Sequence, residues 1–220
     1  MPIASDELTL DELAIALAPS VADAAIFDGW SPTAVRAAAE MEGVDPDVAQ
    51  LAYPGGAMDM IAAWIASVDA AMAEELPAPA LQAMGVGQRI RAMLVFRLER
   101  LMPYRESLRR AMAIMAMPQN AARTARLGWS SADLMWRMAG DTATDLNHYS
   151  KRAILASVYA STLTVFAQDD SDGFADSFAF LDRRLKGVAD FGKFTARFRR
   201  ADAESFSVMR LLGRLRYPAR

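Results

Sequence analysis

The chain has 220 residues, 53% of them hydrophobic and 23% charged, which is enough apolar material for a core and excludes a fully disordered chain. It contains no cysteine and one histidine, so thiol nucleophiles, disulfides, iron–sulfur clusters and Cys/His zinc sites are excluded. The net charge of −3 is unevenly divided, because residues 1–87 hold 14 acidic residues and one basic residue, whereas residues 88–220 hold 13 acidic and 23 basic residues. The acidic part should repel nucleic acid and anionic lipid, and the basic part should attract one of them.

The sequence predicts helices throughout, because alanine is abundant and no stretch alternates apolar and polar residues with a period of two. The expected helices span, in chain order, about 9–27, 32–42, 46–52, 57–76, 87–101, 104–115, 119–139, 141–168, 174–186 and 202–216. Pro19 is a candidate break in the first helix, and Gly128-Trp129 in the seventh. In the helix at 87–101, Arg97 is expected on the solvent-facing side.

The first 75 residues have the spacing of a three-helix DNA-binding head, in which Ser31 and Asp45 cap the second and third helices. A DNA reader needs basic residues on its recognition helix to contact phosphates. The candidate recognition helix at 45–52 carries two acidic residues and no basic residue. The pattern therefore indicates a helix-turn-helix scaffold that has lost DNA binding.

Two acidic segments are candidates for chemistry. Asp141 and Asp145 lie four residues apart, would share one face of a helix start, and could pair with His148 for acid–base catalysis. Acidic residues at a helix start also interact favourably with the helix dipole, which explains them without catalysis.

Residues 168–179 resemble a calcium loop at the third, fifth and sixth positions, but Gln168 and Ala179 stand where carboxylates are required, so an acidic loop is favoured.

The C-terminal segment is predicted to be a basic amphipathic helix suited to a membrane surface. Phe206, Val208, Leu211, Leu212 and Leu215 fall on one arc with Met209 at its edge, Arg210 and Arg214 lie opposite, and Arg216 could extend from the apolar side to the interface. Docking of this helix on its own core or on a second subunit is the alternative. Basic residues at 193–200 favour anionic lipid.

No spanning segment is expected, because the longest uncharged run, at 153–168, has sixteen residues and a membrane span needs about 20. The first apolar stretch follows acidic residues, whereas a secretory signal begins with basic ones. We therefore expect a cytoplasmic protein that is peripheral on the inner membrane face.

Several motifs together resemble a known family. They include Phe27-Asp-Gly-Trp-Ser31, the turn Tyr53-Pro-Gly-Gly56, and a central block from Ser131 to Leu155 that contains Ser-Ala-Asp-Leu-Met-Trp136 and Asp-Leu-Asn-His-Tyr149. This pattern is similar to the accessory lipid-binding proteins of coenzyme Q (ubiquinone) biosynthesis, the ninth family of the Coq series. The resemblance covers about residues 17–185.

The resemblance implies an all-α, TetR-like fold with a degenerate helix-turn-helix head at 1–76, a helical lipid-binding and dimerisation body at 77–190, and a membrane-binding tail at 191–220. It implies a homodimer without a cofactor, a metal or catalytic residues of its own. Such a protein would hold an isoprenoid quinone or a phospholipid and present a quinone precursor to a membrane-bound di-iron demethoxyubiquinone hydroxylase.

The resemblance also implies site residues. The surface for the hydroxylase would comprise Leu98, Met135, Trp136, Asp145, His148, Tyr149 and Arg152. Helical spacing suggests Leu94, Met138, Leu155, Tyr159 and Leu163 for the lipid pocket, although ordinary core packing explains each of them equally well.

Two other functions remain open from the sequence. A ligand-responsive transcription regulator would share the scaffold, but it needs a basic head. An enzyme would rely on Asp141, Asp145 and His148.

Overall fold

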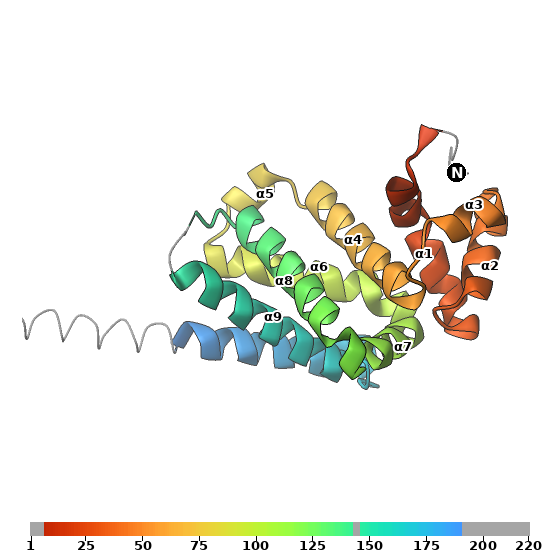
Figure 1. Ribbon diagram of the computed structural model, residues 1–220. Helices are drawn as coiled ribbons and strands as arrows, with labels where there is room; N and C mark the ends of the chain where they lie inside the picture. Colours follow the sequence, from red (N-terminus) through yellow and green to blue (C-terminus); the bar gives the residue numbers. More distant parts are fainter. Residues whose placement is uncertain (1–6, 143–145, 191–220) are drawn as a thin grey trace, which may run out of the picture.

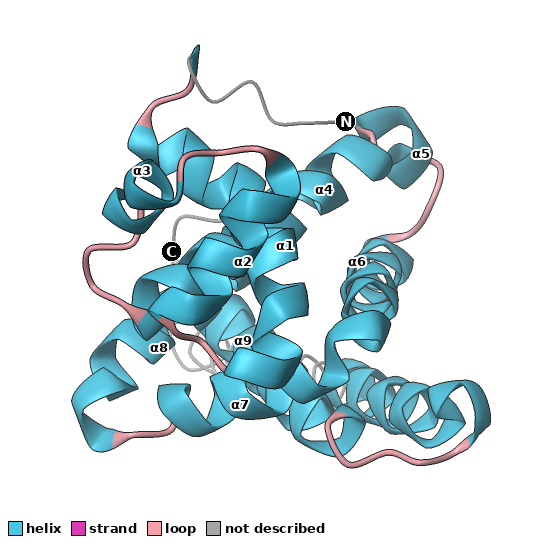
Figure 2. Cartoon of the chain, turned by 90° about the vertical axis from the view of Figure 1, so that its right-hand side faces the viewer, coloured by secondary structure: helices cyan, strands magenta, loops and turns pink. Residues whose placement is uncertain are grey.

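The computed structural model describes residues 7–142 and 146–190, which form helices joined by short loops, with no strand in either range (Figure 2). The all-α class predicted from the sequence is thus confirmed for the described residues. The labelled helices are α1 (Leu10–Asp28), α2 (Pro32–Glu42), α3 (Pro46–Leu51), α4 (Ala57–Glu75), α5 (Ala78–Gln82), α6 (Val86–Leu101), α7 (Arg105–Met115), α8 (Ala121–Met138) and α9 (Leu146–Phe166). A further helix covers residues 175–190.

The first three helices pack together at one end of the molecule, and the remaining helices extend away from them (Figure 1). Local signals define their starts, as the sequence predicted. The Ser31 hydroxyl accepts a hydrogen bond from the backbone N–H of Ala34 at 3.3 Å, and the Asp45 carboxylate accepts one from Asp47 at 2.8 Å. Gly43 ends α2 in the left-handed region, with φ of 73°. The turn into α3 therefore follows from the residues themselves.

Helix α1 runs without interruption through Pro19, so the candidate break there was wrong. Pro19 removes the N–H that would bond to the carbonyl of Ile15. Both residues lie on the exposed face, where water can bind that carbonyl, and the opposite face is fully buried by Leu17 and Val21. Tertiary packing thus keeps the helix continuous.

Hydrogen bonds tie this end of the molecule to the rest. The indole N–H of Trp30 donates to the carbonyl of Ser107 in α7 at 2.9 Å, and the Ser107 hydroxyl donates to the carbonyl of Ala22 in α1. The Trp30 ring lies 5.2 Å from the ring of Trp64 in α4. One cluster of buried apolar side chains accordingly contains residues from α1 through Leu181. The domain boundaries expected from the sequence stay a prediction.

Helix α8 is also continuous, although an interruption was expected near Gly128-Trp129. A glycine inside a helix costs only about 1 kcal/mol relative to alanine, and the packing of α8 against α4 and α9 offsets it. A Cβ added at Gly128 would meet no heavy atom within 4 Å. The position is therefore open space beside a helix.

We predict opposite effects on stability for two glycine substitutions. Gly128→Ala should raise the free energy of unfolding by about 0.5–1 kcal/mol, because alanine restricts the unfolded chain and fits the helix. Gly43→Ala, at a position equally free of neighbours but with positive φ, should lower it by about 1 kcal/mol. Urea denaturation of both variants measures this, and a stabilising Gly43→Ala would contradict the backbone argument.

Candidate functional site

A cavity of about 530 Å³ lies among α4, α6, α7, α8 and α9. Its wall is mostly apolar. The large apolar side chains that line it are Ile61, Trp64, Ile65, Val68, Leu101, Leu108, Met112, Met115, Leu127 and Leu163. A cavity of this size and lining fits a small apolar ligand or part of a longer one.

The cavity opens to the surface beside α8 and α9. Five of its lining residues are exposed, and all of them are small: Ala116, Ala125, Ser157, Ala160 and Thr164. Small side chains at these positions leave the opening unobstructed. A second hollow, which includes Arg109 and Gln168, shares Met112 and Thr164 with the cavity and thus adjoins it.

Arg97 lies in the cavity wall and is 2% exposed, so the prediction of a solvent-facing arginine was wrong. Its guanidinium pairs with Asp69 of α4, and its Nη2 donates to the Ser131 hydroxyl of α8 at 3.4 Å. Ser131 in turn donates to Asp69 at 2.9 Å, and the guanidinium lies 4.8 Å from the centre of the Tyr159 ring. Burial alone would lower the pKa of Arg97, but Tyr159 and Asp69 raise it above its ordinary value, so the side chain is charged.

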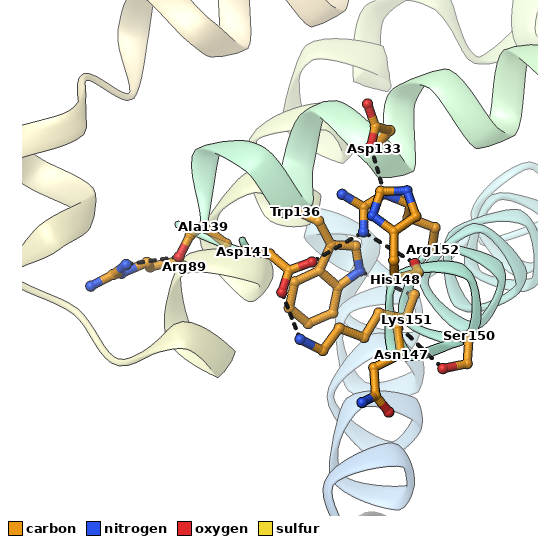
Figure 3. A network of polar contacts seen from close by, with 10 residues as sticks. All are labelled: Arg89, Asp133, Trp136, Ala139, Asp141, Asn147, His148, Ser150, Lys151 and Arg152. Carbon is orange, nitrogen blue, oxygen red and sulfur yellow. Dashed lines mark hydrogen bonds and ion pairs between the residues drawn. The ribbon is translucent and has the colours of Figure 1, made fainter. Parts of the chain in front are cut away.

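A second polar group joins the end of α8 to the start of α9, and we call Asp133, Asp141, Lys151 and Arg152 the α8–α9 ion-pair network (Figure 3). Arg152 Nε donates to Asp133 at 2.5 Å, and its Nη1 donates to Asp141 at 3.0 Å and to the carbonyl of His148 at 3.1 Å. Lys151 reaches the other oxygen of Asp141 at 2.6 Å. The network fixes the direction in which α9 leaves the loop.

Trp136 is part of the same junction. Its indole N–H donates to the carbonyl of Lys151 at 3.0 Å, and the Lys151 ammonium lies 5.3 Å from the ring centre (Figure 3). The residues of the central sequence block thus have a structural task, which is to hold two helices that both line the cavity.

Three aromatic rings lie close together on the outer side of α8 and α9. Tyr149 is 60% exposed, and its ring centre lies 5.1 Å from that of His148 and 6.0 Å from that of Trp129. Trp129 was not among the site residues predicted from the sequence. A signal was available, because Trp129 precedes Trp136 by seven residues and therefore lies on the same face of α8.

Only some of the residues expected to bind lipid line the cavity. Tyr159 and Leu163 line the cavity, whereas Leu94, Met138 and Leu155 are not among its lining residues. Leu94 and Leu155 are buried in the apolar core instead. Helical spacing identifies the inward face of a helix, but it does not distinguish a cavity wall from solid packing.

The residues expected to contact a hydroxylase are divided in a similar way. Tyr149 is exposed, and Trp136 and His148 are partly exposed. Leu98, Met135 and Arg152 are at most 2% exposed, so they support the surface from below. Asp145 lies outside the described residues, as do the tail residues Phe206, Met209, Arg210, Leu212, Arg214, Leu215 and Arg216.

Asp141 and Thr142, the residues expected at the start of the helix, are themselves non-helical, and α9 is described from Leu146. Both of its carboxylate oxygens are paired with cations, which is an arrangement typical of an anchor. Among residues 7–142 and 146–190, no cluster of three or more His, Asp or Glu side chains could hold a metal ion.

In the 168–179 segment, Asp169 caps the turn into the last described helix. Burial raises the pKa of Asp169, but hydrogen bonds from Ser171 and Ser177 outweigh the effect of burial and lower the pKa from 3.8 to about 2.

No helix within the described ranges is long and apolar enough to cross a membrane.

Together the cavity, its buried arginine and the α8–α9 junction define an all-helical protein with an interior suited to an apolar ligand. The COQ9 family model matches residues 121–192, which include α8, the ion-pair network and α9. The chain belongs to the COQ9 family.

Individual relatives agree with this family. The chain is 41% identical to the ubiquinone biosynthesis protein COQ9, mitochondrial, of Rattus norvegicus over 105 residues, covering 48% of this chain and 34% of the rat protein. The protein of the same name from Homo sapiens is 39% identical over 105 residues, covering 48% and 33%. That from Bos taurus is 30% identical over 171 residues, covering 74% and 53%. The chain thus spans about half or less of the length of these curated relatives.

We predict that Arg152→Met destabilises the fold strongly. The side chains of Arg152 and Asp141 are 2% and 5% exposed, so the substitution removes one of the two cations that pair with a buried carboxylate and leaves Lys151 as the other. Loss of the partner of a buried charge costs about 3–5 kcal/mol, and because Lys151 remains we expect a loss near the lower end, about 3 kcal/mol. Chemical denaturation measures the change.

The matched control is Arg91→Met. Arg91 also pairs with an aspartate, Asp182, but both side chains are about half exposed, and such pairs contribute about 0–1 kcal/mol. Equal losses in the two variants would show that the α8–α9 ion-pair network has no special structural weight.

Proposed function

We propose that the chain is a non-catalytic lipid-binding protein of ubiquinone biosynthesis, which holds a polyprenyl quinone precursor and presents it to a membrane-bound di-iron demethoxyubiquinone hydroxylase. The observation that carries the proposal is the apolar cavity between α4, α6, α7, α8 and α9. Relatives that carry the name ubiquinone biosynthesis protein support the pathway.

The physical need for such a protein follows from solubility. A long isoprenoid is too insoluble to diffuse through water, because each exposed CH₂ group costs about 0.8 kcal/mol. Met112 and Met115 line the cavity, and unbranched methionine side chains adapt to irregular apolar ligands. The small residues at the opening would let a chain longer than the cavity extend outward.

The hydroxylase is proposed to dock where Trp136, His148 and Tyr149 reach the surface. These side chains stand at the α8–α9 junction, and the same two helices line the cavity. Exposed aromatic residues beside charged ones are typical of the centre of a protein–protein contact. A partner bound there would contact the helices that also hold the ligand.

The chemistry is proposed to belong to that partner. Asp141, one of the carboxylates considered for catalysis, has both oxygens paired with Lys151 and Arg152. Because each oxygen of this carboxylate already contacts a cation, Asp141 serves to hold α8 and α9 together. The cavity offers binding surface and shelter from water, which are the tasks of a carrier.

Membrane contact is proposed for the basic C-terminal segment, whose predicted helix lies outside the described residues. Residues 193–220 contain eight basic and two acidic residues, which favours a surface of anionic lipid. We propose a homodimer that is peripheral to the cytoplasmic face of the inner membrane. The animal relatives, by comparison, are named as mitochondrial proteins.

We predict that filling the cavity removes bound lipid. Gly128 of α8 lines the cavity, and a Cβ added there would meet no heavy atom within 4 Å. Gly128→Leu should therefore place a side chain in the cavity and reduce the lipid recovered per protein on the order of tenfold, because the apolar contact area is then occupied. Organic extraction of the purified protein followed by mass spectrometry measures the yield.

Gly128→Ala is the matched control, and it should keep its lipid, because a methyl group fills little of the cavity. Both variants are compared at equal amounts of folded protein, judged by circular dichroism. Wild-type protein that yields no isoprenoid or phospholipid would contradict the proposed function.

We also predict that removing the residues after Asp202 weakens binding to anionic vesicles. Each arginine near such a surface contributes about 1 kcal/mol, and the deleted segment contains four. Vesicle flotation measures the bound fraction, with neutral vesicles as the control. Unchanged flotation of the shortened chain would exclude this role of the tail.

A further inference from the structure

The apolar cavity contains one feature that lipid binding alone does not require, which is the buried guanidinium of Arg97. Arg97 is the only charged side chain among the described residues that line the cavity. It comes from α6, and its partners Asp69 and Ser131 come from α4 and α8. A charged group of this kind is costly to place in an apolar wall, so the site has a polar end that is built from three helices.

The hydrogen bonds of this group are incomplete. Nη1 and Nη2 of Arg97 have partners in Asp69 and Ser131, but the Nε–H is buried and has no acceptor among the described residues. Buried polar atoms in proteins almost always have a partner. A donor without an acceptor, on a residue that lines a cavity, indicates that the acceptor comes with the ligand.

The charges decide which acceptor fits. Arg97 and Asp69 together are neutral, so an anionic ligand would bring an uncompensated charge into an apolar site. A neutral oxygen, such as a quinone carbonyl, accepts a hydrogen bond without that cost. Tyr159, whose ring lies against the guanidinium, also lines the cavity and offers a flat apolar surface for a ring.

We propose that Arg97, supported by Asp69 and Ser131, binds a neutral ring oxygen of the ligand and makes the cavity selective for an oxygen-bearing ring over plain hydrocarbon and over a phosphate headgroup. This inference rests on the proposed lipid-binding function. Because Arg97 is buried and the small residues at the opening are exposed, the ring enters first and the isoprenoid chain leaves through the opening.

The test uses three probes that carry the same geranyl chain and differ only at one end: geranyl-benzoquinone, geranylbenzene and geranyl phosphate. Isothermal titration calorimetry gives their affinities for the full chain. The protein has no cysteine, so thiol addition to the quinone does not interfere. Wild-type protein should bind the quinone roughly tenfold more tightly than geranylbenzene, which is the range expected for one hydrogen bond to a charged donor.

Two variants remove the Nε–H in different ways. Arg97→Lys keeps the positive charge opposite Asp69, and the double variant Arg97→Met/Asp69→Leu removes both charges together, so that no charge is buried alone. In each, the preference for the quinone should fall to within about twofold, while the affinity for geranylbenzene stays unchanged. Arg100→Lys, on the same helix with a half-exposed side chain, is the matched control and should keep the preference.

The outcomes separate the two proposals. Equal affinity of wild-type protein for geranyl-benzoquinone and geranylbenzene, a preference that persists in both Arg97 variants, or tightest binding of geranyl phosphate would overturn the role of Arg97. If wild-type protein binds neither geranylbenzene nor geranyl-benzoquinone, the proposed lipid-binding function itself is overturned.

Discussion

The arrangement of α8 against α9 depends on a buried guanidinium. Arg152 joins Asp133 in α8 to Asp141 in the loop that follows it, and Arg152 itself belongs to α9. Buried ion pairs contribute little net stability compared with apolar packing, but they disfavour every arrangement in which a charge loses its partner. Because α8 and α9 both line the cavity, the pairing also determines the shape of the site.

The structure combines a tightly packed part with an open one. Near the N-terminus, alanine-rich helices pack closely, and Ala18, Ala22, Ala34 and Ala38 are fully buried. An open apolar cavity lowers stability, because its lining loses contacts that a filled core would make. The close packing of α1 and α2, joined to α7 by the hydrogen bond from Trp30 to Ser107, contributes stability that offsets part of this loss.

Much of the helical architecture followed from local signals. The caps at Ser31 and Asp45 lie where the sequence placed them, because a side-chain acceptor followed by proline acts within a few residues. The expected interruptions at Pro19 and Gly128-Trp129 were wrong, since packing against neighbouring helices outweighs a local preference of a few kcal/mol.

The site was less predictable than the helices. The solvent-facing position expected for Arg97 was wrong, because its environment is set by Asp69, which lies 28 residues earlier in the chain. Of the residues expected to bind lipid, Tyr159 and Leu163 line the cavity and Leu94, Met138 and Leu155 do not. The pattern shows which face turns inward, and it holds no information on whether the space beyond is filled.

The sequence by itself determined the all-helical class, the starts of the early helices, the uneven charge and the family motif, because these depend on near neighbours, on composition or on contiguous residues. The tertiary structure alone decided that a cavity exists, that Arg97 faces it and that Asp141 is an anchor. These properties depend on distances between side chains from helices far apart in the chain, and such distances are set only when the helices pack.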